Sequence, residues 1–219
     1  YEIGSGLAGS EMCIRDRNRR EALNTEIINR ALLKLGENPI SSQNELPHGR
    51  NFNLIYDDVR RSLLSMYVWR FAVKTAELAP LDEKTETNRQ YRFQLPADLI
   101  TVLNVGDFYK FPDLRGLKMS SGERYVILGD KIECDFNPLP LAYVADIDDA
   151  TKYPPLFKEA MAARLAIELT VKIHRNLNLY QLLESQFVQA ISSAMQHNDI
   201  IQDTQALGEN SWVMIREAW

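Results

Sequence analysis

The chain has 219 residues, of which 45% are hydrophobic and 25% are charged, and its formal net charge is −5. These values are ordinary for a soluble globular protein with one large or two small domains. The acidic balance argues against a protein that wraps nucleic acid, and no run approaches the ~20 consecutive apolar residues of a membrane span.

Residues 1–17 differ from the rest of the chain. They lack hydrophobic periodicity and the apolar core of a signal peptide. Their second half, GSEMCIRDR, is similar to translated sequencing-adapter read-through. We therefore expect residues 1–17 to be non-native and leave them out of the fold, and the alternative is a native disordered arm. The arginines around position 17 receive no nucleic-acid interpretation.

Two helices are predicted next. The first lies within INRALLKLGENPISS, residues 28–42, and ends at Gly36, because glycine can adopt the left-handed conformation that closes a helix. Pro39 prevents the same helix from resuming. The second helix covers residues 52–67. Its apolar stripe advances in steps of three and four and comprises Phe52, Ile55, Tyr56, Val59, Leu63, Met66 and Tyr67.

The face of the second helix opposite this stripe carries charge. Asp57 and Asp58 precede Arg60 and Arg61, and all four are expected to be exposed. Arg60 and Arg61 are candidates for ion pairs with a neighbouring subunit, although a solvated face is the simpler interpretation. After the helix the period changes to two. Trp69, Phe71 and Val73 alternate with polar or small residues, which predicts a half-buried strand.

This succession of elements resembles the start of the tail tubular protein A family, the head-to-tail adaptors of short-tailed phages. Members begin with the pattern xNxxLxxxGxxPIxS and continue through a helix into a Trp-containing strand. The residues of this chain that match are Asn29, Leu32, Gly36, Pro39, Ile40, Ser42 and Trp69. The resemblance continues at YRFQLPADLITVLNV, residues 91–105, and by helix order over residues 155–195.

The middle of the chain is predicted to be an antiparallel sheet or small sandwich. Short apolar and β-branched runs lie at residues 91–95, 101–105, 125–128, 131–136 and 141–147. Gly129-Asp130 suits a two-residue hairpin turn. Residues 82–88 and 107–122 are expected to be loops, and alternation along the second hairpin strand places Cys134 toward the core.

The last third of the chain returns to helix. Residues 156–174 are apolar around most of the predicted helix, so this helix is either central in a bundle or covered by a neighbouring subunit. Its narrow polar stripe is Arg164, Glu168, Lys172 and Arg175. A final helix, residues 179–195, is expected to pack with Leu182, Leu183, Phe187, Ala190, Ile191 and Ala194.

The predicted fold is therefore α+β, with an antiparallel helical bundle of about four helices and an inserted antiparallel sheet. The bundle takes residues 18–68 and 148–203, and the β domain takes residues 69–147. Residues 204–219 form a tail with an apolar end, Trp212, Val213, Met214, Ile215 and Trp219. An apolar terminus must dock somewhere. It either folds back onto its own core or, as the resemblance implies, binds a neighbouring subunit or the portal ring.

No pattern in the sequence indicates catalysis, and we expect no enzyme activity, no cofactor and no metal. The histidines His48, His174 and His197 are scattered, and the cysteines Cys13 and Cys134 have no partner at metal-ligand spacing. The carboxylates Asp146, Asp148 and Asp149 could hold a cation, but a solvated turn before a helix is the simpler interpretation.

The resemblance implies a structural virion protein, made in the host cytoplasm and incorporated at the phage neck. Such adaptors form a ring, a dodecamer, between the portal protein and a tail nozzle similar to tail tubular protein B. DNA passes through the ring without sequence-specific binding, and an acidic wall suits that passage. The alternative is a non-catalytic α+β accessory protein, or another neck or tail-completion protein, that acts as a monomer or dimer. An enzyme of unknown type is a third, weaker possibility.

Overall fold

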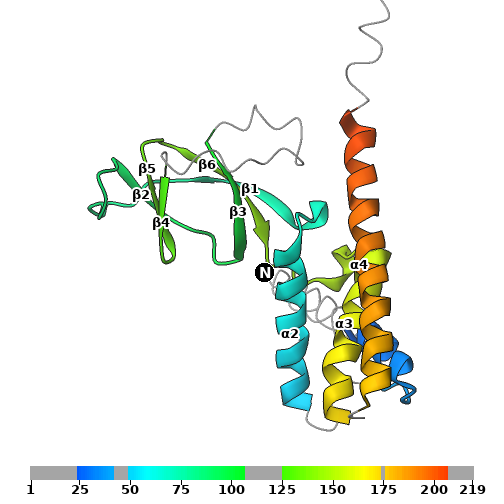
Figure 1. The fold of residues 1–219 in the computed structure, drawn as a ribbon. Coiled ribbons are helices and arrows are strands. Elements are labelled where there is room, and N and C mark those ends of the chain that lie inside the picture. Colours follow the sequence, from blue (N-terminus) through cyan, green and yellow to red (C-terminus); the bar gives the residue numbers. More distant parts are fainter. Residues whose placement is uncertain (1–23, 42–48, 107–124, 174–175, 207–219) are drawn as a thin grey trace, which may run out of the picture. The chain divides into compact units, whose positions relative to one another are not determined.

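The computed structural model describes residues 24–41, 49–106, 125–173 and 176–206. As predicted, the fold is mixed α+β; the described residues form four α-helices and two antiparallel three-stranded sheets (Figure 1). The chain divides into two compact units. The first contains the chain up to Leu63 together with Asp148–His197, and the second contains Leu64–Ile147 together with the chain from Asn198.

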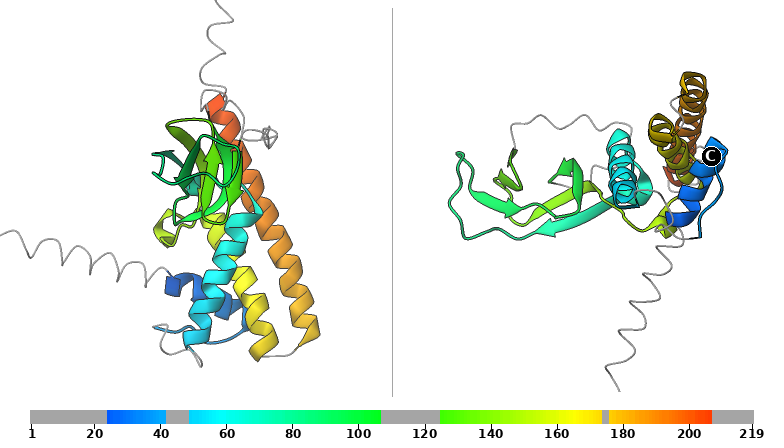
Figure 2. Two further views of the ribbon diagram at one scale, coloured as in Figure 1. Left: turned by 90° about the vertical axis from the view of Figure 1, so that its left-hand side faces the viewer. Right: turned by 90° about the horizontal axis from the view of Figure 1, so that it is seen from below.

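The first unit is helical. Its elements are a helix over residues 24–35, most of α2 (Gly49–Met66), α3 (Pro155–Ile173) and most of α4 (Leu177–Ala206). Helix α3 lies between α2 and α4 (Figure 2). Its described side chains are buried around most of its circumference by the chain itself, which is one of the two arrangements predicted, and Arg164 pairs with Glu168 on the polar stripe at 2.8 Å.

Ion pairs attach the first described helix to α3. The carboxylate of Glu159 on α3 lies 2.6 Å from the Lys34 ammonium and 3.8 Å from the Arg30 guanidinium. Beneath these partly exposed charges, the apolar side of the helix is buried. The buried residues of this helix are Ile27, Ile28, Ala31, Leu32 and Leu35, at the spacing of an amphipathic helix.

Three details of the helical prediction were wrong. The buried stripe of α2 continues from Leu63 to Leu64, so Met66 lies off the stripe with an exposed fraction of 49%. On α4 the buried stripe runs from Leu183 through Ile191 to Ala194, which leaves Leu182 at 54% exposure. Helix α4 also continues to Ala206, whereas a non-helical tail was predicted from residue 204.

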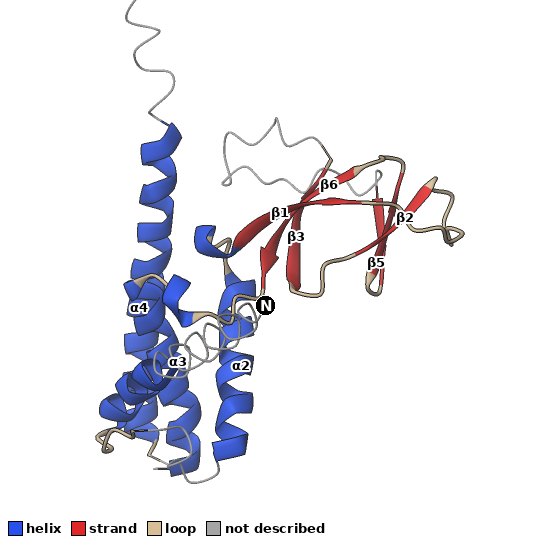
Figure 3. Cartoon of the chain, turned by 180° about the vertical axis from the view of Figure 1, so that it is seen from behind, coloured by secondary structure: helices blue, strands red, loops and turns tan. Residues whose placement is uncertain are grey.

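The second unit contains the two sheets, drawn in red in Figure 3. The first sheet has the order β1 (Val73–Leu78), β6 (Leu139–Ala145) and β3 (Leu99–Val105). The second has the order β2 (Tyr91–Gln94), β5 (Lys131–Cys134) and β4 (Tyr125–Leu128). Antiparallel pairing holds throughout both sheets. The chain thus passes repeatedly between the sheets, and only β4 and β5 are a hairpin of adjacent strands.

The β4–β5 hairpin is confirmed. Leu128 pairs with Lys131 across Gly129-Asp130, and Gly129 has φ +62°, a value that glycine adopts without a steric penalty. Cys134 is fully buried, as the alternation predicted, and its thiol is free. Of the two loops predicted between strands, residues 82–88 are a loop, and residues 107–122 lie outside the described residues.

The predicted strand at Trp69 was wrong in its first half. Arg70–Ala72 is a turn of 3-10 helix, in which the Ala72 N–H donates to the Trp69 carbonyl at 2.9 Å, and β1 begins only at Val73. Asn198 explains the departure from a strand. Its side chain accepts from the Arg70 N–H at 3.0 Å and donates to the Val68 carbonyl at 3.1 Å, so both backbone groups beside Trp69 are occupied.

Candidate functional site

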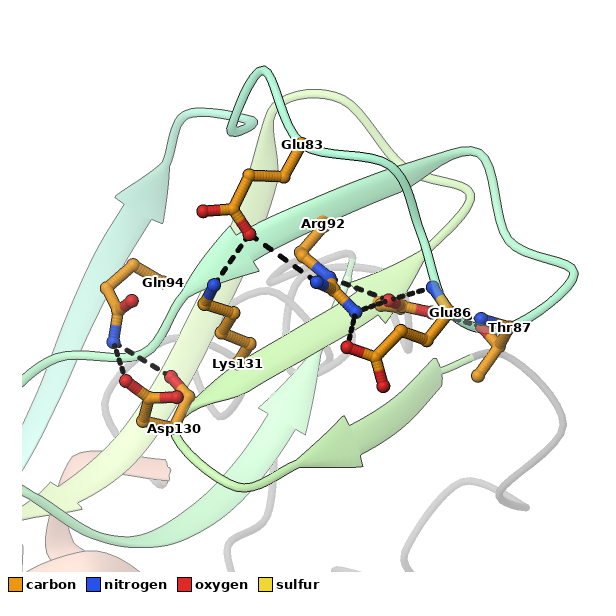
Figure 4. Close-up of polar contacts among 8 residues, drawn as sticks. Glu83, Glu86, Thr87, Arg92, Gln94, Asp130 and Lys131 are labelled. Atoms are coloured by element: carbon orange, nitrogen blue, oxygen red, sulfur yellow. Dashed lines mark hydrogen bonds and ion pairs between the residues drawn. The ribbon is translucent and has the colours of Figure 1, made fainter.

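A cluster of charged side chains forms on one face of the second sheet. Arg92 on β2 and Glu133 on β5 occupy directly opposite positions in the register and are both buried. We call the six residues the Arg92 cluster: Arg92, Glu133, Glu83, Glu86, Thr87 and Lys131 (Figure 4). Strand alternation places Arg92 and Glu133 on the same face, opposite the apolar face that contains Phe93 and Ile132.

The guanidinium of Arg92 contacts three carboxylates. Its Nε and Nη2 lie 2.8 Å and 2.7 Å from Oε1 of Glu133. The same Nη2 is 2.7 Å from Glu86 Oε1, and Nη1 is 3.4 Å from Glu83 Oε2. Lys131 supplies a second cation and reaches Glu83 at 2.6 Å. Buried charges are stable only when they are paired in this way.

Glu133 also binds the loop that precedes β2. Its carboxylate accepts the backbone N–H of Glu86 at 2.7 Å, the backbone N–H of Thr87 at 2.8 Å, and the Thr87 hydroxyl. Two residues further, Asp135 accepts the Gln90 N–H at 3.1 Å and pairs with Arg89 at 2.8 Å. Glu133 within β5 and Asp135 directly after it therefore both hold this loop in one conformation.

These contacts determine the ionisation of the cluster. Burial by itself would raise the pKa of Glu133, but hydrogen bonds from Thr87, from the Glu86 backbone and from Arg92 overcome it and lower the pKa to about 2. Hydrogen bonds to Glu86 and Glu133 in turn raise the pKa of Arg92. Both groups are therefore charged near neutral pH, which suits a structural role better than proton transfer.

The prediction treated residues 82–88 as an exposed charged loop. Asp82, Glu83, Lys84 and Glu86 are exposed, in agreement with it. The Arg92 cluster itself was missed, because Arg92 and Glu133 occupy positions in strands that are expected to face solvent, and the sequence gives no pairing between β2 and β5. The only hint of the cluster in the sequence was that a single arginine, Arg92, and a single glutamate, Glu133, each lie within a short strand.

The residues of the family-like pattern have definable local roles. The Asn29 side chain donates to the Ile40 carbonyl at 2.9 Å and accepts the Ile40 N–H at 2.8 Å, so it pairs with that backbone as a strand would. Gly36 has φ +77°. Its N–H bonds to the Leu33 carbonyl at 3.1 Å, and the Glu37 N–H bonds to the Leu32 carbonyl at 2.9 Å, which is a Schellman cap.

The hollow beside this clasp is shallow and open. It has a volume of about 480 Å³ and is lined by Asn29, Ile40 and neighbouring residues of the first described helix, including Leu33 with 63% exposure. The clasp and the cap together return the chain against the helix it has just left. The pattern thus specifies a local fold.

The predicted partner-binding residues have different outcomes. Arg61 is exposed on α2, as expected. Arg60 is buried, with an exposed fraction of 6%, and pairs with Asp57 at 2.7 Å, so its expected exposure was wrong. The reason is its spacing: Arg60 lies three and four residues from the buried Leu63 and Leu64, on the same side of the helix. The apolar end of the tail, Trp212 to Ile215 and Trp219, lies outside the described residues.

The carboxylate, histidine and cysteine candidates from the sequence have separate outcomes. Asp149 caps the 3-10 turn Ala150–Lys152 by accepting the Thr151 N–H at 3.0 Å, in agreement with the interpretation of a turn. His197 is exposed on α4, while His48, His174 and Cys13 lie outside the described residues. Among the residues that the structure describes, no three His, Cys, Asp or Glu side chains are grouped as metal ligands. None of the described helices is long and apolar enough to cross a membrane.

No protein-family model matches the chain, and no curated protein matches it.

Proposed function

We propose that this chain is a structural adaptor of the tail tubular protein A type, which forms a ring between the portal and the tail nozzle of a short-tailed phage. The observation that carries the proposal is the N-terminal pattern. Its Asn29 clasps Ile40 and its Gly36 forms the helix cap, so these two residues act in the fold rather than in chemistry. A motif of this kind is expected in a protein whose function is assembly.

The proposed architecture follows the same resemblance. The helical unit is an antiparallel bundle built from both ends of the chain, and the β unit is inserted between its halves. Subunit contacts in the ring would use the outer surface of the bundle, where Leu177 and Val188 on α4 are 69% and 56% exposed. Permanent interfaces bury ~2,000 Å² or more, so several elements must contribute to each contact.

The Arg92 cluster is consistent with a loop that is held in place for binding to a partner. Glu83, Lys84 and Glu86 are exposed at the surface, yet their loop is held from beneath by a buried carboxylate, which fixes its backbone before any partner arrives. A preordered loop loses less conformational entropy on binding. In the proposed adaptor, this loop would contact the tail nozzle.

Light scattering tests the proposal. The protein, started near residue 18, is measured alone and after mixing with the portal protein encoded beside it. A stoichiometric ring on the portal is expected. A stable monomer or dimer that does not bind the portal protein would contradict the adaptor function and favour the alternative of an accessory neck protein.

Arg61 and Arg60 allow a sharper test of the ring contact. Because Arg61 is exposed on α2, Arg61→Glu should weaken ring formation while leaving the unfolding midpoint of the subunit nearly unchanged. Arg60→Glu is not equivalent, because Arg60 is buried and its replacement should destabilise the subunit itself. The exposed Lys152, at the end of the 3-10 turn Ala150–Lys152, provides the control for a charge reversal, as Lys152→Glu.

A further inference from the structure

The two sheets have four edge strands, and three of them have features that discourage pairing with another chain. Strand β1 has the charged residues Lys74 and Glu77. Strand β3 has two irregularities in its register with β6. The outer side of β2 is already occupied, since the Leu81 N–H donates to the Arg92 carbonyl at 2.8 Å. Charges, bulges and covering segments are the usual means of protecting an edge.

The fourth edge strand, β4, has none of these features. Its sequence is YVIL, without charge or proline, its register with β5 is regular, and Ile127 is 44% exposed. Among the described residues, β4 has no backbone partner besides β5. An apolar, regular edge of this kind is a template for strand addition.

The register shows which groups are available on β4. A two-residue turn makes Leu128 and Lys131 a hydrogen-bonded pair, and such pairs alternate along an antiparallel ladder. Val126 therefore bonds to β5, whereas Tyr125 and Ile127 direct their N–H and C=O groups away from it. Two donors and two acceptors thus lie along the outer edge.

We infer that the free chain forms a two-fold dimer by antiparallel pairing of β4 with β4 of a second copy. With Val126 opposite Val126 of the partner subunit, Tyr125 of each copy pairs with Ile127 of the other. All the outward backbone groups are then satisfied by four hydrogen bonds, and no like charges face each other, because the strand has none. The edge is self-complementary, which is the requirement of a two-fold contact.

This dimer goes beyond the proposed ring and does not depend on it. A two-fold contact closes on itself and cannot recur between equivalent neighbours of a cyclic ring. The pairing would therefore belong to the unassembled chain, where it covers an edge that would otherwise be open to aggregation. It involves only four residues per copy, so a weak, concentration-dependent association is expected.

Sedimentation velocity over a wide range of concentrations measures the association. Ile127→Lys places a charge on the edge and should weaken dimerisation by at least about tenfold. Leu182→Lys makes the same change at an exposed apolar position of α4 and should leave dimerisation unaffected. A monomer at all concentrations, or a dimer that both variants disturb equally, would overturn the inference.

A cross-link tests the register. The paired Val126 positions are a non-hydrogen-bonded pair, with a Cα separation of about 4.5 Å, which is within the range of a disulfide. Val126→Cys should form a covalent dimer under mild oxidation much faster than Leu182→Cys. Equal rates would reject the pairing, and so would strong exchange protection of the Tyr125 and Ile127 amides in the monomer, since the chain itself would then cover the edge.

Discussion

At the scale of single residues, buried polar side chains organise segments that have no regular structure. Glu133 binds the loop before β2, Asn29 binds Ile40, and Asn198 binds both sides of Trp69. In each case a side chain takes the hydrogen bonds that a strand or helix would otherwise supply. The requirement behind all three is that buried backbone groups must be paired.

The first residue-scale prediction concerns Glu133→Gln. The amide would place its NH2 against one of the two N–H groups of Glu86 and Thr87, leave only one oxygen to accept the other, and remove the charge that faces Arg92. The urea midpoint should fall, and the amides of Glu86 and Thr87 should exchange faster. Glu184→Gln, on the exposed face of α4, is the control and should change neither. Unchanged exchange of both amides would show that Glu133 does not hold the loop.

The low pKa of Glu133 also predicts how stability depends on pH. The carboxylate has a pKa of about 2 in the folded protein and an ordinary value of 4.5 when unfolded. The unfolded chain therefore binds the proton first, and the stability that Glu133 provides is present above pH 4.5 and lost as the pH falls toward 2. Urea unfolding across this range should show a steeper acid loss in the wild type than in Glu133→Gln. Equal slopes would contradict the assignment.

At the scale of elements, the ends of helices and strands decide how the chain turns. The first described helix ends in a Schellman cap, after which Asn29 draws the chain back to Ile40. Helix α2 ends at Met66, and a 3-10 turn redirects the chain into β1. The burial of Trp69, with 1% exposure, depends on that turn.

Removal of the Asn29 clasp should destabilise the helical unit. Asn29→Ala loses two hydrogen bonds, each worth about 0.5–1.5 kcal/mol, so the free energy of unfolding should fall by about 1–3 kcal/mol. Chemical denaturation measures this change. Gln181→Ala, exposed on α4, should be nearly neutral. A neutral Asn29→Ala would mean that the clasp is not formed in solution.

The cap at Gly36 gives a second prediction at this scale. A Cβ added at Gly36 would meet no atom within 4 Å, so the effect of Gly36→Ala should come only from its φ of +77°. The left-handed conformation costs about 1–2 kcal/mol for an alanine. Gly36→Asn should cost less, because asparagine tolerates this region better. If both variants were as stable as the wild type in thermal melts, the cap would not be needed.

At the scale of the whole molecule, the proposal makes this chain one subunit of a ring. Its charge of −5 and its central helix α3, buried within its own unit, are compatible with a protein that is stable before assembly. Interfaces in the proposed ring would then use surfaces outside this core. For that reason, a variant can be expected to lose the proposed assembly while the chain itself stays folded.

Deletion of residues 211–219 tests the assembly role of the tail. In the proposed adaptor, the truncated chain should keep its circular dichroism spectrum and thermal transition but lose ring formation or portal binding, because tryptophan anchors often contribute ~2 kcal/mol or more each to an interface. A truncated chain that fails to fold would instead place this segment on the subunit's own core.

The sequence by itself determined the fold class, the hairpin at Gly129-Asp130, the apolar circumference of α3 and the core-facing Cys134. All of these follow from local periodicity or from turn chemistry, which need no knowledge of distant residues. The tertiary structure alone decided that Arg92 meets Glu133, that Asn198 converts the start of the Trp69 strand into a turn, and that Arg60 is buried. The first two pairings join residues 41 and 128 positions apart. The energy of such pairs depends on which strands and helices become neighbours, and no local pattern contains that information.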